Sequence, residues 1–89
     1  MLICKKCFVT GQVQGVFYRA TSQHQAVKLG IKGYAKNIPD GRVELLVCGE
    51  KLKVEQFCDW LWTGSNGARV DDVQCESVRE MAVESFTTA

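Results

Sequence analysis

The chain has 89 residues, the size of one small domain, so we expect a single domain over residues 1–89. Its 11 Lys and Arg residues balance 10 Asp and Glu residues, and the formal net charge of +1 lacks the basic excess that drives nucleic-acid binding. No apolar stretch reaches the roughly 20 residues that span a bilayer, and two lysines interrupt the N-terminus where a secretory signal would be apolar. We therefore expect a cytoplasmic protein with no nucleic-acid and no membrane partner.

The first third of the chain predicts a strand followed by a helix. Residues 3–11 are rich in Cys, Phe, Val and Thr, which favour a strand. Gly11 and Gly15 then bracket a short turn. A helix is expected over residues 17–29, because apolar and small side chains recur there at helical spacing and Gly30 stands where a C-cap glycine belongs.

The middle of the chain predicts a β-hairpin and a second helix. Residues 31–37 and 42–48 are expected to be strands, and Asp40-Gly41 between them is a strong hairpin signal. Apolar side chains then recur at helical spacing at Val54, Phe57, Cys58, Leu61 and Trp62. This stripe places Trp62 in the core and leaves Trp60 outside it.

The C-terminal part predicts two further strands, over residues 69–78 and, less clearly, 82–86. The resulting order, β-α-β-β-α-β, is typical of an α+β ferredoxin-like two-layer sandwich, in which two helices cover one face of an antiparallel sheet. In that topology the third strand lies between the first two, which run parallel. We therefore expect the loop after the first strand and the end of the second strand, at Asn37, to lie at the same edge of the sheet.

The loop between the first strand and the first helix is a candidate anion site. The backbone N–H groups of such a loop can converge on an anion, and the helix dipole favours negative charge there. Arg19, in the first helical turn, could hold phosphate oxygens with two parallel hydrogen bonds. Asn37 could hold a water in line with a bound phosphate. On these residues alone, the more common alternative of a solvated surface arginine stays open.

Two segments resemble the signatures of the acylphosphatase family. GQVQGVFYR resembles G-x-V-Q-G-V-x-F-R, and LGIKGYAKNIPDGRVELLVCGE resembles L-G-(L/I)-x-G-(W/Y)-(V/A)-x-N-x-x-D-G-x-V-E. The similarity is clear from Thr10 to Glu50 and looser as far as Val70. Ser65 departs from the family, which often has proline there, and this departure is expected to loosen the turn after Gly64.

The resemblance implies an acylphosphatase, which hydrolyses the carboxyl-phosphate bond of small acyl phosphates to a carboxylate and inorganic phosphate. Arg19 matches the phosphate-binding arginine of the family, and Asn37 matches its water-orienting asparagine. The implied substrate-binding residues are Gln14, Gly15, Val16, Phe17, Tyr18 and Arg19. The resemblance also implies catalysis without metal or cofactor, with inorganic phosphate as product and inhibitor, and we expect a monomer.

The five cysteines cannot all pair within the chain, and thiols are their default state in a reducing compartment. Cys4 and Cys7 form a CxxC motif, but inside a strand residues i and i+3 point to opposite faces, which disfavours a shared metal. Antiparallel pairing of the first and third strands would bring Cys4 close to Cys48 on the open face of the sheet. A disulfide between these two is therefore an alternative to free thiols.

Other functions stay open at this point. A ferredoxin-like RNA-binding module would need exposed aromatic side chains on the central strands, where only Phe8 and Tyr34 are available. A metal chaperone would carry CxxC in the loop after the first strand. A carbamoyl-phosphate-handling domain of a larger maturation protein is a third alternative. His24, the only histidine, is expected on the surface of the first helix and outside any active site.

Overall fold

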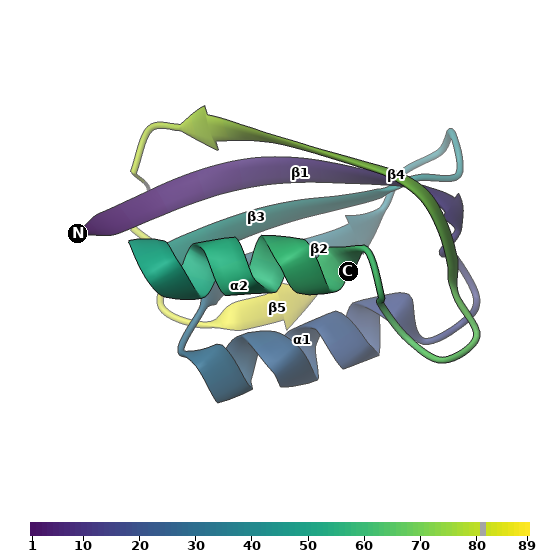
Figure 1. Ribbon diagram of the computed structural model, residues 1–89, viewed down its shortest axis with the longest axis horizontal. Coiled ribbons are helices and arrows are strands. Elements are labelled where there is room, and N and C mark those ends of the chain that lie inside the picture. Colours follow the sequence, from purple (N-terminus) through teal and green to yellow (C-terminus); the bar gives the residue numbers. More distant parts are fainter. Residues whose placement is uncertain (81) are drawn as a thin grey trace.

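The computed structural model describes residues 1–80 and 82–89, in which the elements follow the predicted order β-α-β-β-α-β with a short fifth strand after it (Figure 1). The elements are β1 (Leu2–Gln12), α1 (Tyr18–Leu29), β2 (Lys32–Asn37), β3 (Val43–Glu50), α2 (Lys51–Leu61), β4 (Arg69–Val78) and β5 (Phe86–Thr88). None of the helices in the described part of the chain is long and apolar enough to cross a membrane.

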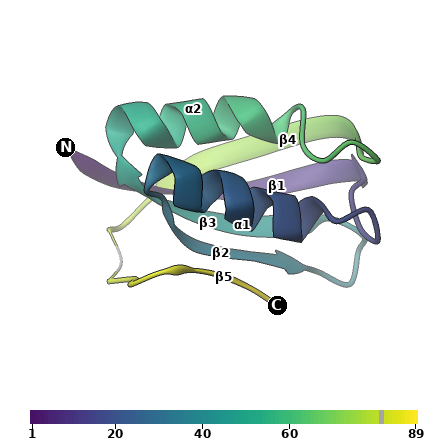
Figure 2. The same cartoon turned by 90° about the horizontal axis from the view of Figure 1, so that it is seen from below.

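The strands form one sheet with the order β4-β1-β3-β2-β5. β3 lies between β1 and β2 and is antiparallel to both, so β1 and β2 run in the same direction. Both helices cover the same face of this sheet (Figure 1 and Figure 2). The predicted ferredoxin-like sandwich is therefore confirmed.

The main core lies between the sheet and the two helices. Alternate residues of the strands face it, among them Val9 on β1 and Leu45 on β3, both fully buried. The buried side chains of α1 are Tyr18, Ser22 and Ala26, and those of α2 are Val54, Phe57 and Leu61. His24 is exposed on α1, as expected.

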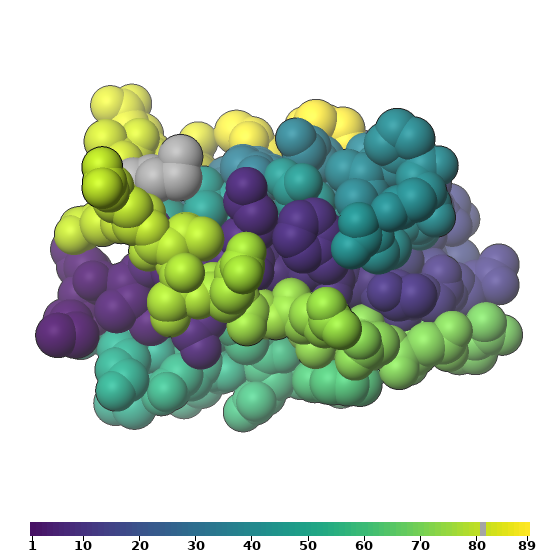
Figure 3. All heavy atoms as spheres, turned by 90° about the horizontal axis from the view of Figure 1, so that it is seen from above, coloured from purple at the N-terminus to yellow at the C-terminus, as the bar shows by residue number. Residues whose placement is uncertain are grey.

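The fifth strand differs from its prediction. It was expected over residues 82–86, but residues 82–84 belong to no strand and β5 begins at Phe86. β5 pairs in parallel with β2, and its Phe86 side chain is buried against Phe57. The ladder depends on backbone groups, so the polar side chains of this segment gave no signal for it. β5 lies at the edge of the sheet opposite β4 (Figure 3).

The two tryptophans exchange the roles that helical spacing predicts. α2 ends at Leu61, so Trp62 is its C-cap residue and is 53% exposed. The Trp60 ring instead stacks on Phe57 at 5.7 Å between centroids and lies 6.1 Å from the Tyr18 ring. Trp60 therefore fills the space between the two helices, and the prediction that Trp62 lies in the core is wrong.

Four of the five cysteines form disulfides, in contrast to the default expectation of thiols. Cys4 lies directly opposite Cys48 across β1 and β3 and is bonded to it. Cys7 faces the helices, lies opposite Cys75 across β1 and β4, and is bonded to that residue. The first pair was an alternative on sequence grounds, whereas the second could not be predicted, because the register of β4 cannot be read from composition.

Candidate functional site

The loop before α1 and the turn after β2 meet at one end of the sheet, as the topology predicts (Figure 2). Gln14 joins them, because its Nε2 atom donates to the carbonyl oxygens of Ile38 and Arg42, each at 3.0 Å. The turn has its own support, since the Asp40 carboxylate accepts from the backbone N–H and Nε of Arg42. The loop is thus anchored to the segment that follows Asn37.

The backbone of this loop has the shape of an anion nest. Gly15 and Phe17 are left-handed, with φ of 76° and 60°. Phe17 is the N-cap of α1 and passes directly into the right-handed helix at Tyr18. Alternating left- and right-handed residues turn successive N–H groups to one side, and the first N–H groups of any helix lack intrahelical acceptors. This backbone can therefore bind an oxyanion.

An open cavity of about 280 Å³ lies at the start of α1. Its lining combines loop, helix and the end of β5: Val13, Gly15, Phe17, Tyr18, Arg19, Ala20 and Thr88. Arginine is the charged side chain of this lining, and the lining contains no carboxylate. The electrostatic character of the cavity therefore favours an anion.

The structure brings Arg19 close to the end of β2. Its guanidinium donates to the backbone oxygen of Ala89, and the backbone N–H of Ala89 donates in turn to the carbonyl oxygen of Ala35 at 3.1 Å. Ala35 precedes Asn37 by two residues on β2. Arg19 is therefore held over β5 at the same end of the sheet as Asn37.

The side-chain oxygen of Asn37 is in an environment that is rare in folded proteins. It is the last residue of β2, and its Oδ1 atom is buried with no hydrogen-bond partner in the described part of the chain. A buried acceptor without a donor costs about 1–3 kcal/mol. Such an orphaned acceptor is available to a donor from outside the chain, such as a water.

Tyr18 supports the site from behind. Its hydroxyl donates to the carbonyl oxygen of Leu61 at 2.7 Å, and burial raises the pKa of this hydroxyl above its ordinary value. The group therefore stays protonated and ties the first turn of α1 to the end of α2. Of the predicted substrate-binding residues, Tyr18 contributes a buried anchor as well as a place in the cavity lining.

Ser65 is a neighbour of the candidate site whose contact with the loop the sequence does not predict. Its side chain is buried, and its Oγ atom donates to the carbonyl oxygen of Val16 at 2.7 Å. The bond ties the turn after α2 to the candidate anion loop. Sequence gave no signal for it, because the two residues are 49 positions apart.

We expect Ser65→Ala to lower the free energy of unfolding by about 1–2 kcal/mol, because Val16 would keep a partly buried carbonyl oxygen without its donor. Urea unfolding followed by circular dichroism measures the change. Thr63→Ala is the matched control, since Thr63 is an exposed hydroxyl residue of the same segment. Equal urea midpoints for the two variants would show that the bond to Val16 contributes nothing.

Phe17 stores strain in the same loop. It is the non-glycine residue with positive φ in the described chain, and its side chain is 82% exposed. A left-handed conformation costs a residue with a Cβ about 1–2 kcal/mol. We expect Phe17→Gly to raise the free energy of unfolding by up to about 1 kcal/mol, since glycine regains part of this cost through its larger unfolded-state entropy.

The control for this prediction is Phe17→Ala, which removes the exposed ring and keeps the Cβ atom. Urea unfolding should show stabilisation for glycine and none for alanine. If alanine stabilises the protein as much as glycine does, the exposed ring and not the backbone conformation is responsible.

Comparison with known proteins finds relatives that match nearly the whole length of the chain. The family model described as Acylphosphatase matches residues 5–88. An acylphosphatase of Chromohalobacter salexigens is 49% identical over 83 residues, which cover 93% of this chain and 92% of that protein. The acylphosphatase structure from Coxiella burnetii superimposes with a TM-score of 0.96 at 34% identity, covering 99% of this chain and 93% of the other. The Bacillus subtilis acylphosphatase structure gives 0.94 at 32% identity, with coverage of 100% and 99%.

Proposed function

Because the chain belongs to the acylphosphatase family, we propose that Arg19 and the backbone N–H groups of residues 14–19 hold the phosphate of an acyl phosphate while Asn37 places the attacking water. The enzyme is an acylphosphatase, so its products are a carboxylate and inorganic phosphate. The site geometry supports these separate roles for Arg19, the loop and Asn37.

Phosphate binding is assigned to the start of α1. The loop presents N–H groups in a nest conformation, and the helix dipole adds positive potential at the same point. Arg19 lines the cavity and can leave its contact with Ala89 to form a bidentate pair with phosphate oxygens. A charge-assisted pair with a doubly charged phosphate is stronger than a bond to a backbone oxygen, so substrate would displace that contact.

The orphaned Oδ1 atom of Asn37 is the observation that carries the proposal. A water that donates one hydrogen to this oxygen keeps its lone pairs free to attack phosphorus. Asn37 itself is not part of the cavity lining, so the water would have to bridge from its carboxamide to the phosphate. The carboxamide does not ionise, so it orients the water without removing its proton. We propose that the bound phosphate accepts that proton as the new P–O bond forms.

Hydrolysis of an acyl phosphate requires the protein mainly to position the reactants and to stabilise charge. The leaving carboxylate of an acyl phosphate is stable, so no side chain has to protonate it. Holding water and phosphate in line removes an entropic barrier, and the N–H groups and guanidinium stabilise the charge that builds up on the phosphate oxygens. The lining of the cavity offers no carboxylate for Mg²⁺, in keeping with the proposed metal-independent reaction.

The direct test follows phosphate release from benzoyl phosphate and acetyl phosphate with EDTA present. We expect hydrolysis of both substrates, competitive inhibition by inorganic phosphate, and no change when the chelator is omitted. Loss of activity in EDTA that Mg²⁺ restores would overturn metal independence. Non-competitive inhibition by phosphate would show that the phosphate site and the substrate site differ.

A further inference from the structure

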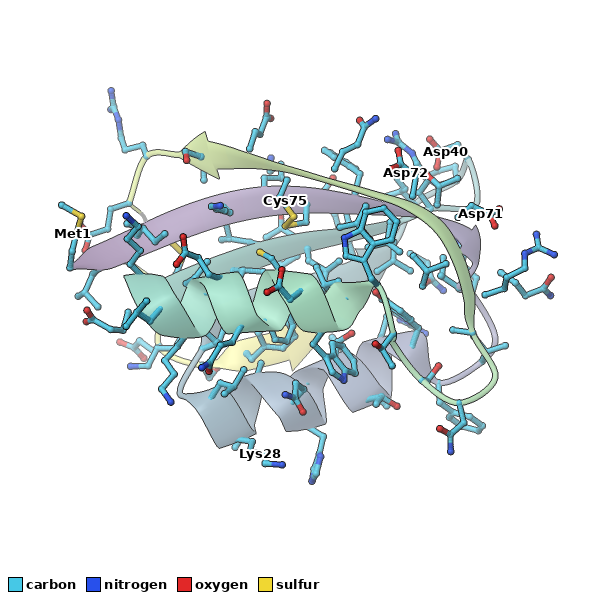
Figure 4. All side chains as sticks on the ribbon, in the orientation of Figure 1. Met1, Lys28, Asp40, Asp71, Asp72 and Cys75 are labelled. Atoms are coloured by element: carbon cyan, nitrogen blue, oxygen red, sulfur yellow. A yellow bond between two sulfur atoms is a disulfide. The ribbon has the colours of Figure 1, made fainter. Side chains whose placement is uncertain are left out.

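Three cysteines from three elements converge beneath α2, away from the phosphate loop. Cys7 belongs to β1, Cys75 to β4 and Cys58 to α2. Their three Sγ atoms all lie within 4.8 Å of one another, and those of Cys7 and Cys58 are 3.8 Å apart. Figure 4 labels Cys75, whose sulfur lies between β4 and α2.

The fold places each sulfur for a separate reason. Cys7 and Cys75 are directly opposite in the β1–β4 register, and both face the helices. Cys58 follows Phe57 on α2 and is packed partly buried against the same core. A disulfide between Cys7 and Cys75 needs only two of these groups, so the third sulfur is not explained by the cross-link.

We propose that the cluster of Cys7, Cys58 and Cys75 is a binding site for one thiophilic metal ion, with Cu⁺ as the best match, when the Cys7–Cys75 disulfide is reduced. Three thiolates arranged in a plane around one metal ion, with metal–sulfur bonds of about 2.3 Å, lie roughly 4 Å from one another. The Sγ atoms of Cys7 and Cys58 are close to this separation.

The ligand set distinguishes among metals. Soft thiolates select Cu⁺, Zn²⁺ and iron–sulfur clusters over hard cations. Structural Zn²⁺ sites take four protein ligands, whereas this group contains three sulfurs and, within the described residues, no fourth Cys, His, Asp or Glu. Cu⁺ accepts three thiolates in a plane, so the cluster suits it better than Zn²⁺, which would need a water as its fourth ligand.

Binding is coupled to reduction, because the same sulfurs cannot form a disulfide and hold a metal. Two molecules of a low-molecular-weight thiol supply the two electrons and two protons that open the Cys7–Cys75 bond, and they leave as their own disulfide. Cu⁺ then displaces three thiol protons and leaves a complex of charge −2. Lys5 lies on the same side of β1 as Cys7, two residues before it, and offsets part of this charge.

The cluster is separate from the proposed catalytic site. Cys7 precedes Val13, where the cavity lining begins, by six residues of β1 and its extension. Six strand residues span roughly 20 Å. Metal binding at the cysteines therefore goes beyond the proposed function and can be measured without any assay of hydrolysis.

The experiment uses a Cys4→Ser/Cys48→Ser background, which removes the sulfur pair on the opposite face of the sheet. The protein is reduced with a phosphine, kept without oxygen, and titrated with Cu⁺ against the chromogenic chelator bicinchoninate. We expect one Cu⁺ per chain to be withdrawn from the chelator, and X-ray absorption to count three sulfur neighbours. Cys58→Ser should abolish this stoichiometric transfer, and the unreduced protein should take up no Cu⁺.

Two results would overturn the proposal: equal Cu⁺ uptake by Cys58→Ser and its parent, or a count of two sulfur neighbours. A parallel titration with Zn²⁺ should give weaker binding, and tighter binding of Zn²⁺ would contradict the assignment to Cu⁺. If the double serine background does not fold, Cys58→Ser in the natural sequence gives the same comparison, because the Cys4–Cys48 pair is then common to both proteins. Far-UV circular dichroism establishes that each variant is folded.

Discussion

Replacing Arg19 with lysine is expected to lower kcat/KM for benzoyl phosphate by about 10²–10³-fold, the usual effect of losing one preorganised donor to a developing anion. Lysine keeps the positive charge but lacks the planar fork that binds two phosphate oxygens at once. The loss should therefore fall on KM as well as on kcat, and the inhibition constant for inorganic phosphate should rise with it. Steady-state kinetics with phosphate as a competitive inhibitor measures all three quantities.

Arg79→Lys is the matched control, because Arg79 is exposed and follows the end of β4 that pairs with Cys4, whereas Val13 of the cavity lining follows the opposite end of β1. We expect its kinetics to equal those of the parent. If phosphate inhibits Arg19→Lys as strongly as it inhibits the parent, the guanidinium does not bind phosphate and the assignment of Arg19 is wrong. In that case the role of Arg19 would be its contact with Ala89, and the variant would lower only the free energy of unfolding.

Asn37→Ala is expected to lower kcat by about 10²-fold or more with little change in KM, because the carboxamide acts on the water and not on the bound substrate. The same variant should not lower the free energy of unfolding. Oδ1 of Asn37 is buried without a partner, so its removal relieves a polar atom that costs about 1–3 kcal/mol in the folded state. Activity and stability should thus move apart, which is the pattern expected of a group retained for function.

The measurements are steady-state kinetics and urea unfolding on the same preparation. Gln56→Ala removes a carboxamide from the exposed side of α2 and should change neither quantity. A drop in kcat that accompanies an equal drop in stability would mean that Asn37 supports the fold of β2. An unchanged kcat would show that Asn37 does not orient the attacking water.

Much of the fold could be predicted from local patterns. The alternation in β3, the helical spacing of α1 and the Asp40-Gly41 turn each lie within a few residues, where side-chain spacing and backbone preference act directly. Their order fixed the β1–β3–β2 arrangement, and this arrangement placed Asn37 near the loop that leads to Arg19. The sequence therefore predicts where the candidate site lies, and resemblance to the family names its residues.

The parts that could not be predicted are contacts between distant segments. Ser65 hydrogen-bonds to Val16 through a turn whose position depends on where α2 ends. Trp60 packs on Tyr18 because the two helices lie side by side, and the separation of two helices cannot be read from the sequence of either one. Each of these is a packing result, and neither has a periodic signal in the sequence.

The sequence by itself determined the order of the elements, the residues of the loop before α1 and the place of Asn37 at the end of the second strand. Only the tertiary structure decided the place of β5 and the register of β4, and with that register the meeting of Cys7 with Cys75 and Cys58. The physical reason is that strand ladders are made by backbone N–H and C=O groups, which every residue except proline carries alike. Side-chain patterns therefore specify which face of a strand is buried, whereas the partner and the register follow from the packing of the whole chain.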